Sequence, residues 1–263
     1  MKISDLTMPD YKLLENKKVL IVDDNSMNRI LARRTMANYD ILITEVQNGK
    51  EAIDEIIKDN FDIILMDIQM PVMNGIQATR IIRKELKLST PIVALTGSTL
   101  KEQIDQCLSA GMDAYIVKPF NKEILLQTLL NVSQQKTSVI QHETKDREPQ
   151  HMMDYDISKI EEISRGDKEF VNRMIGLFVK TIPSSLQKMK MAFQEKDFKT
   201  LNAITHRIKP SIDVLGITQI SEEIKQVEFL SLEKPNSELI PQFLVKIENV
   251  LNQVIDQLTN ELD

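Results

Sequence analysis

Five polar residues of the first half of the chain come directly after short apolar runs. They offer three carboxylates, a hydroxyl group and an ammonium group: Asp23, Asp24, Asp67, Thr96 and Lys118. Carboxylates that lie close together repel one another unless a cation neutralises them. Oxygen-only ligands favour a hard cation, and Mg²⁺ suits a site that also takes an anionic substrate oxygen. If the five side chains converge, they predict a magnesium site.

The same residue types could carry out phosphoryl transfer. A carboxylate beside Mg²⁺ and a lysine can attack phosphorus and form an aspartyl phosphate. Each residue alone has a simpler explanation. Asp24 could cap a helix that begins near Ser26, Asp67 could start a turn, and Lys118 could be a surface lysine. The combination of all five at strand ends favours a reactive site over chance.

The apolar runs themselves predict the elements that would position these groups. They are rich in branched residues, begin about every 20 to 30 residues, and lie at 19–22, 41–43, 63–66, 92–95 and 115–117. Such runs are typical of buried parallel strands, and the spacing leaves room for one crossover helix between each pair. We therefore expect an α/β fold with a five-stranded parallel, doubly wound sheet. Ligands bind such sheets beyond the carboxyl ends of the strands.

The second half, residues 153–263, shows helical periodicity almost throughout. Asp167 is a candidate N-cap of one helix, a second helix is expected after Asp197, and Gly216 is a candidate stop for that second helix. Pro183 is expected to kink or end the first of these helices. A short helix at 157–163 and two more at 217–232 and 237–262 complete a predicted four-helix bundle, with residues 134–152 as a flexible linker.

One histidine lies in this predicted bundle. His142 and His151 fall in the linker, whereas His206 lies in a helix whose apolar face is formed by Leu201, Ile204, Ile208, Ile212 and Leu215. His206 points away from that face and is predicted to be exposed, with Lys209 one turn later. An imidazole can attack phosphorus, and a lysine at this spacing can neutralise the phosphate formed. A lone surface histidine is usually without a role, but a neighbouring aspartyl-phosphate site would give it one.

Composition excludes several classes of protein. The length of 263 residues suggests two domains, and 33 basic against 39 acidic side chains argue against a nucleic-acid binder. The single cysteine, Cys107, excludes an internal disulfide and a cysteine zinc site, and it fits a reducing compartment. No apolar run approaches the roughly 18 residues that cross a bilayer. We expect a cytoplasmic protein with no membrane or nucleic-acid partner, in which residues 1–17 form an N-terminal extension.

Residues 18–133 resemble the receiver domain of two-component response regulators. The motifs V-L-I-V-D-D-N, I-I-L-M-D-I-Q-M-P-V-M-N-G, P-I-V-A-L-T and Y-I-V-K-P-F occur in the family's order and spacing. The resemblance implies that Asp67 is the phosphoacceptor. It also implies that Asp24 and Asp67 ligate Mg²⁺ directly, Asp23 through water, and Gln69 through its backbone carbonyl.

The resemblance assigns roles to the remaining strand ends as well. Thr96 would hydrogen-bond the phosphoryl group, and Lys118 would pair with it. Tyr115 matches the aromatic residue that swings inward on activation, and the Lys118–Pro119 bond would be cis. Gly97 stands where the family often has alanine, and both residues are small enough to leave Asp67 accessible.

The run H-R-I-K-P-S followed by L-G resembles the histidine-containing phosphotransfer domain, an antiparallel four-helix bundle. The resemblance covers residues 153–263 but depends on this one short motif. It implies that His206 is the phosphorylated residue and Lys209 its electrostatic partner. The family commonly has glycine four residues after the histidine, where this chain has Pro210. That proline removes a helix hydrogen bond to the His206 carbonyl and is expected to bend the helix.

Together these features predict a phosphorelay signal transduction protein. Asp67 accepts a phosphoryl group, and His206 donates or accepts it, with a sensor histidine kinase or a downstream response regulator as partner. No kinase core is visible, so we expect self-dephosphorylation but no enzyme activity on other substrates. The chain could instead be the C-terminal receiver-phosphotransfer portion of a hybrid sensor histidine kinase.

Two other functions fit the sequence less well. A Mg²⁺-dependent phosphatase of the haloacid-dehalogenase type needs D-x-D after its first strand, whereas this chain has D-D-N-S. A transcription regulator needs a basic recognition helix, but the second half carries 14 basic and 18 acidic residues. Turnover of a small phosphomonoester would favour the phosphatase, and salt-sensitive DNA binding would favour the regulator.

Overall fold

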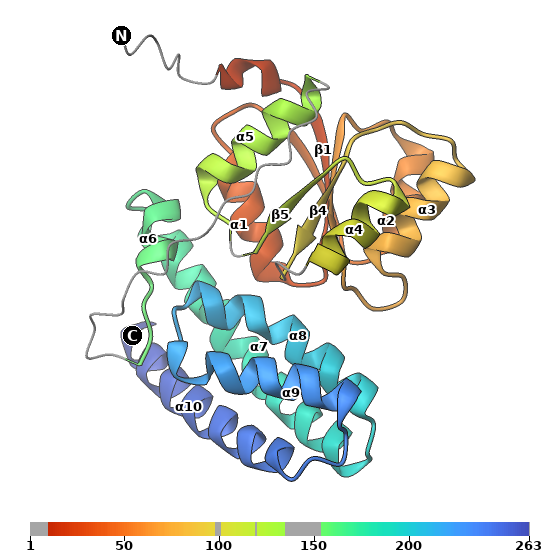
Figure 1. The fold of residues 1–263 in the computed structure, drawn as a ribbon. Coiled ribbons are helices and arrows are strands. Elements are labelled where there is room, and N and C mark those ends of the chain that lie inside the picture. Colours follow the sequence, from red (N-terminus) through yellow and green to blue (C-terminus); the bar gives the residue numbers. More distant parts are fainter. Residues whose placement is uncertain (1–9, 98–100, 119, 135–153, 263) are drawn as a thin grey trace, which may run out of the picture. The chain divides into compact units, whose positions relative to one another are not determined.

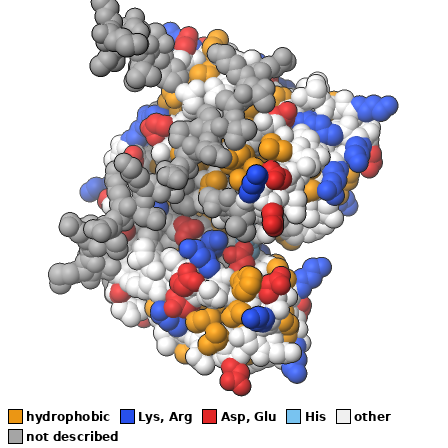
Figure 2. All heavy atoms as spheres, viewed as in Figure 1, with side chains coloured by type: hydrophobic (Ala, Val, Ile, Leu, Met, Phe, Trp, Pro, Cys, Tyr) orange, Lys and Arg blue, Asp and Glu red, His pale blue; other side chains and the backbone are white. Residues whose placement is uncertain are grey.

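The computed structural model describes residues 10–97, 101–118, 120–134 and 154–262. The chain forms two compact units (Figure 1). We call residues 10–134, which contain the strands, the sheet unit, and residues 154–262, which contain α6 to α10, the helical unit. All but the first residue of the predicted linker lies outside the described residues, and so do His142 and His151. On the face shown in Figure 2, acidic, basic and apolar side chains are interspersed on each unit.

The sheet unit contains a five-stranded parallel sheet, which confirms the predicted fold class. Its strands are β1 (Lys18–Val22), β2 (Leu42–Val46), β3 (Ile63–Asp67), β4 (Ile92–Thr96) and β5 (Ala114–Val117), in the order β2-β1-β3-β4-β5. Every residue of β3 and β4 is buried. The near-continuous apolar runs follow from this position, because helices cover both faces of the central strands.

Helices pack on each face of the sheet. The core on one face joins Val19 and Ile21 to α1 (Ser26–Met36) and α5 (Lys122–Ser133). The core on the other face joins the alternate residues of β1 to α2 (Gly49–Lys58), α3 (Gly75–Lys84) and α4 (Lys101–Ala110). This alternation places successive strand side chains in opposite cores.

The N-terminal segment is part of the sheet unit from residue 10 onward. A short 3-10 helix, η1 (Tyr11–Leu14), contacts α5. Leu14 is fully buried in the core that also contains Val19, and the ring of Tyr11 packs edge-on against Tyr39. The described part of the expected extension therefore adds apolar contacts to the sheet unit.

The helical unit is built from helices alone in the part of 154–262 that the structure describes. They are α6 (Ser158–Ser164), α7 (Lys168–Gln194), α8 (Phe198–Val214), η2 (Thr218–Ile220), α9 (Ser221–Glu233) and α10 (Leu239–Leu262). The predicted N-cap at Asp167 is confirmed, because Asp167 accepts a hydrogen bond from the amide of Phe170 at 3.0 Å. The structure adds a second cap at Asp197, which accepts from the amide of Thr200 at 3.0 Å. Gly216 adopts a φ of +58° just after α8, as a helix stop requires.

Pro183 does not end its helix, so that part of the expectation is wrong. Helix α7 continues for 27 residues with Pro183 inside it, and α8 likewise continues through Pro210. An internal proline costs about 3 kcal/mol in a helix, but α7 buries Phe178 and Ile182 on one side of this point and Leu186 on the other. This apolar stripe packs in the core on both sides of Pro183, and such packing supplies most of the stability of a helix in a protein. Among the described helices, none is long and apolar enough to cross a membrane.

Candidate functional site

An acidic cluster lies at the carboxyl ends of β1 and β3. Asp23 and Asp24 directly follow β1, and Asp67 is the last residue of β3. One carboxylate oxygen from each of the three lies within 4.8 Å of the others. Asp23 and Asp67 are buried, and Asp24 is partly buried. The convergence predicted from the strand ends is thus confirmed, and the oxygen-only ligands fit a hard cation such as Mg²⁺.

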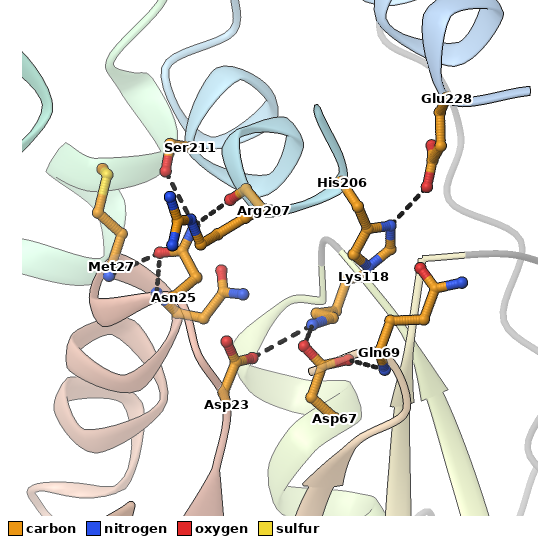
Figure 3. A network of polar contacts seen from close by, with 11 residues as sticks. Asp23, Asn25, Met27, Asp67, Gln69, Lys118, His206, Arg207, Ser211 and Glu228 are labelled. Atoms are coloured by element: carbon orange, nitrogen blue, oxygen red, sulfur yellow. Dashed lines mark hydrogen bonds and ion pairs between the residues drawn. The ribbon is translucent and has the colours of Figure 1, made fainter. Parts of the chain in front are cut away.

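Lys118, which directly follows β5, joins this cluster from a neighbouring part of the sheet (Figure 3). Its Nζ lies 2.7 Å from Oδ2 of Asp67 and 3.2 Å from Oδ2 of Asp23. Burial works to lower the pKa of Lys118, but the two carboxylates outweigh it and hold that pKa well above its ordinary value. Lys118 therefore stays an ammonium group at neutral pH. It supplies a fixed positive charge beside the Asp67 carboxylate.

The loop after β3 holds the Asp67 carboxylate and brings α3 close to it. The amide of Gln69 donates to Oδ1 of Asp67 at 3.3 Å, and the amide of Gly75 donates to the Ile68 carbonyl at 3.0 Å. A Cβ atom on Gly75 would lie only 2.1 Å from the Asp67 carbonyl oxygen. Gly75 is thus a positioning residue that the motifs did not single out. A signal was present, because Asn74 caps α3 directly before it. The predicted role of the Gln69 carbonyl stays a prediction.

The other predicted residues of this site lie on β4 and β5. Thr96 is the last residue of β4, and it is buried. Its carbonyl accepts a hydrogen bond from the Lys118 amide at 2.6 Å, which places it beside the cluster. Tyr115 is buried in the core that contains Cys107 and Met112. Pro119, and with it the expected cis bond, lies outside the described residues.

A second polar site lies between α8 and α9 of the helical unit. Nδ1 of His206 lies 2.5 Å from Oε1 of Glu228 on α9, and Nζ of Lys209 lies 3.5 Å from Oε2 of the same carboxylate. The side-chain amide of Asn202 donates to the Glu228 backbone carbonyl at 2.7 Å. Burial works to raise the pKa of Glu228, but the hydrogen bond and charge of His206, with Lys209, outweigh it and hold that pKa below its usual range.

The predicted exposure of His206 is therefore wrong, because only 16% of its side chain is exposed. The predicted apolar stripe of α8 is buried as expected. However, the imidazole of His206 contacts Glu228 on α9. Lys209 lies near His206 as predicted, but it is paired with Glu228. Glu228 itself was missed, because its approach to His206 depends on how two helices pair and leaves no spacing signal in the sequence.

Comparisons with known proteins agree with the architecture of the sheet unit. Residues 19–130 match the family model of the response regulator receiver domain. The chain is 39% identical over 123 residues to the autoinducer 2 sensor kinase/phosphatase LuxQ of Vibrio vulnificus, a match that covers 47% of this chain and 14% of that protein. It is 25% identical over 223 residues to the sensor protein GacS of Pseudomonas syringae pv. syringae, covering 81% of this chain and 24% of that protein.

A solved structure is also similar in sequence to part of the chain. It is the receiver domain of sensor histidine kinase PA1611 from Pseudomonas aeruginosa PAO1 with a magnesium ion in the active site cleft. The identity is 35%, the match covers 44% of this chain and 96% of that one, and the TM-score is 0.41. The family match, the parallel five-stranded sheet and the acidic cluster at its carboxyl edge agree. Residues 19–130 form a response regulator receiver domain.

Proposed function

We propose that this chain is a phosphorelay protein in which Asp67 accepts a phosphoryl group and His206 donates or accepts it. The observation that carries the proposal is the Asp67 carboxylate, paired with Lys118 inside a three-carboxylate cluster of a receiver domain. The proposal also depends on the His206 imidazole of the helical unit, whose Nδ1 atom lies 2.5 Å from Oε1 of Glu228. We take residues 18–133 and 153–263 as the receiver and phosphotransfer domains.

At the receiver site, a carboxylate oxygen of Asp67 attacks phosphorus, and the bond to the donor's leaving group breaks. The ammonium group of Lys118, which pairs with the free carboxylate, then forms an ion pair with the new phosphoryl oxygens. Thr96 donates a hydrogen bond from its hydroxyl group to the same oxygens. Asp23, Asp24 and Asp67 would hold Mg²⁺, which supplies positive charge for the phosphoryl oxygens. Gly75 keeps the space next to the Asp67 backbone that this geometry needs.

At the helical site, His206 acts as the nucleophile in transfer from an aspartyl phosphate, and as the donor in the reverse direction. Lys209 can move from Glu228 to a phosphoryl group on His206, because its 3.5 Å pairing is loose and its side chain is long. Transfer to another protein would require a receiver in a partner. A downstream response regulator, or a sensor histidine kinase that supplies the phosphoryl group, fits this chemistry.

The relatives favour a sensor-kinase setting for the same chemistry. The GacS match covers 81% of this chain and therefore extends beyond the receiver domain into the helical unit. The chain spans 24% of GacS and 14% of LuxQ, both of which are named as sensor proteins. A second candidate is therefore the receiver-phosphotransfer portion of a hybrid sensor histidine kinase. In either setting we expect no catalysis beyond loss of phosphate from Asp67.

The test is phosphosite mapping on the full chain after incubation with acetyl phosphate and MgCl₂. We expect label at Asp67 and at His206 in the wild type, at Asp67 alone in His206→Gln, and at neither site in Asp67→Asn. Asp54→Asn, on the exposed surface of α2, and His142→Gln are the matched controls and should behave as wild type. Wild-type labelling of Asp67→Asn would show that another residue is the acceptor. Steady release of nitrophenol from nitrophenyl phosphate would support a phosphatase instead.

A further inference from the structure

Gly49, the first residue of α2, lies against the loop that follows Asp67. This loop, residues 68–74, connects β3 to α3, and we call it the phosphoacceptor loop. We infer that Gly49 is a positioning residue of the receiver site, which anchors this loop and so fixes the backbone around Asp67. The inference rests on the proposed function of Asp67 and adds a residue outside the acidic cluster. Gly49 acts through the loop and touches neither Mg²⁺ nor the phosphoryl group.

A side chain at position 49 has no room. An ideal Cβ atom on Gly49 would lie 2.8 Å from the carbonyl oxygen of Met73, 2.9 Å from its Cγ atom and 2.8 Å from Cβ of Ala78 on α3. Gly49 has no positive φ and belongs to a helix, so alanine could adopt its backbone conformation. Glycine is therefore needed here for the close approach of the loop and of α3, and not for its conformational freedom.

The same residue is bonded to the phosphoacceptor loop through its backbone. The amide of Gly49 donates to the Met73 carbonyl at 3.0 Å. The first amides of a helix have no partner within that helix. The side chain of the capping residue, Asn48, accepts from the amide of Glu51 at 3.0 Å, so the loop carbonyl satisfies the Gly49 amide.

The first turn of α2 is a fixed support for this hydrogen bond. The Glu51 carboxylate accepts from Nδ2 of Asn48 at 2.8 Å and from the Gln47 amide at 2.9 Å. Ala52 of α2 and Ala78 of α3 are both fully buried and belong to the same core. The helix therefore presents its first amide to the loop from a defined position.

The anchored end of the loop leads directly back to Asp67. Met73 lies two residues before Gly75, whose amide donates to the Ile68 carbonyl at 3.0 Å. A Cβ atom on Gly75 would lie 2.1 Å from the Asp67 carbonyl oxygen. At the other end of the loop, the Gln69 amide donates to Oδ1 of Asp67 at 3.3 Å. Displacement of Met73 by a side chain at position 49 would therefore disturb the backbone that holds the Asp67 carboxylate.

Val72 indicates that the conformation of the loop depends on such an anchor. Its φ is +68°, which is unfavourable for a branched residue, and its side chain is 80% exposed. Strained backbone persists only where surrounding contacts determine it. The next residue, Met73, supplies two of these contacts, because its carbonyl accepts from Gly49 and its amide donates to the Pro71 carbonyl at 2.8 Å.

Variants of the full chain test this role. Gly49→Ala adds the side chain, and Gly176→Ala is the matched control, because Gly176 lies within α7 and a Cβ atom there would meet nothing within 4 Å. Ala78→Gly and the double variant Gly49→Ala/Ala78→Gly remove the Ala78 methyl group but leave the Met73 carbonyl in place. The readouts are the Mg²⁺ dissociation constant of the unlabelled chain by calorimetry, hydrogen exchange of the residue 49 amide and of the β1 and β3 amides, and the rate at which acetyl phosphate labels Asp67.

We expect Gly49→Ala to bind Mg²⁺ about 10-fold more weakly, as loss of the contacts that orient metal ligands does elsewhere. Labelling of Asp67 should be slow at low MgCl₂ and recover in part at saturation. The double variant should lose less stability than the sum of the two single changes, because the clash with Ala78 is gone. Its Mg²⁺ affinity should stay about 10-fold low, because residue 49 still meets the Met73 carbonyl. Gly176→Ala should match the wild type in Mg²⁺ affinity and labelling.

The wild type provides a test that no folding defect can obscure. If the anchor favours Mg²⁺ binding, Mg²⁺ must strengthen the anchor in return, because such coupling is reciprocal. Saturating MgCl₂ should therefore slow hydrogen exchange of the Gly49 amide by a larger factor than that of the β1 and β3 amides. An unchanged Gly49 amide would overturn the inference.

Failure of the inference and failure of the proposed function are distinguishable. If Asp67→Asn is labelled as fast as the wild type, the proposed function is wrong. If Asp67→Asn is unlabelled but Gly49→Ala binds Mg²⁺ with wild-type affinity, the proposed function stands and Gly49 has no positioning role. If Ala78→Gly restores the Mg²⁺ affinity of Gly49→Ala together with its stability, the loss came from packing against α3, and the inference is again refuted.

Discussion

Replacing Lys118 by Met should strongly destabilise the receiver domain. The side chain of Lys118 is 7% exposed, and its ammonium group pairs with Asp23 and Asp67, whose side chains are 0% and 4% exposed. Removing one partner from a buried ion pair costs about 3–5 kcal/mol, because the remaining charge has no counterion. Met keeps most of the aliphatic volume, so the loss reports the charge. We expect a decrease of about 3 kcal/mol or more in the free energy of unfolding.

Hydrogen exchange of the β1 and β3 amides measures this change in the sheet unit alone. Each 1.4 kcal/mol corresponds to a tenfold change in an equilibrium constant, so these amides should exchange at least about 100-fold faster in Lys118→Met. Lys17→Met is the matched control. Lys17 pairs with Asp62 at the surface, where the two side chains are 37% and 39% exposed, and such pairs contribute about 1 kcal/mol or less.

Conditions that restore the stability of Lys118→Met identify why the stability was lost. Saturating MgCl₂ should restore part of the stability, because a cation at the acidic cluster replaces the missing positive charge. In the wild type, the raised pKa of Lys118 means that its contribution persists through neutral pH and is lost only in strong alkali. Exchange in Lys118→Met that matches Lys17→Met would refute this reasoning.

Four further changes test separate parts of the structure. Gly75→Ala should slow labelling of Asp67 by acetyl phosphate and destabilise the domain by about 1–3 kcal/mol, because the new Cβ would lie 2.1 Å from a backbone oxygen; wild-type labelling would refute the close approach. Val72→Gly should raise the melting temperature, because Val72 is 80% exposed and has a φ of +68°, a conformation that costs a branched residue about 1 kcal/mol; no rise would show an unstrained loop. Arg83→Met should cost about 2 kcal/mol in urea unfolding, because the guanidinium donates to three carbonyls and a carboxylate; a loss below that of a surface arginine would contradict this. Glu228 has a lowered pKa, so its contribution to stability is present above its unfolded-state pKa and disappears as the pH falls through the folded-state pKa. Glu228→Gln should therefore reduce the dependence of the free energy of unfolding on pH in the acid range, and an unchanged dependence would contradict the ion pair.

The strands and the acidic site were predictable because their signals are local. A strand buried on both faces must be apolar, and a parallel sheet brings every strand end to one edge. The sequence alone therefore placed Asp23, Asp67 and Lys118 together. Strand β2 was predicted less well. It extends from Leu42 to Val46 and includes Thr44 and Glu45. An edge strand tolerates such polar residues, so its apolar run is shorter than the strand itself.

The helical unit shows what local signals leave out. The caps at Asp167 and Asp197 were predictable, since each satisfies amides within its own helix. The continuity of α7 through Pro183 and the burial of His206 were not, because both depend on packing against other helices. Glu228 lies 22 residues after His206. Only the pairing of α8 with α9 brings the two together.

The most direct test of the phosphorelay is a pulse-chase experiment on the full chain. Labelled acetyl phosphate with MgCl₂ is added briefly, excess unlabelled donor follows, and the label at each residue is followed with time. The relay predicts that label appears first at Asp67, then declines there as it rises at His206, and that Asp67→Asn carries no label at His206. Label that reaches His206 as fast in Asp67→Asn as in the wild type, or that never leaves Asp67 except as free phosphate, would contradict it.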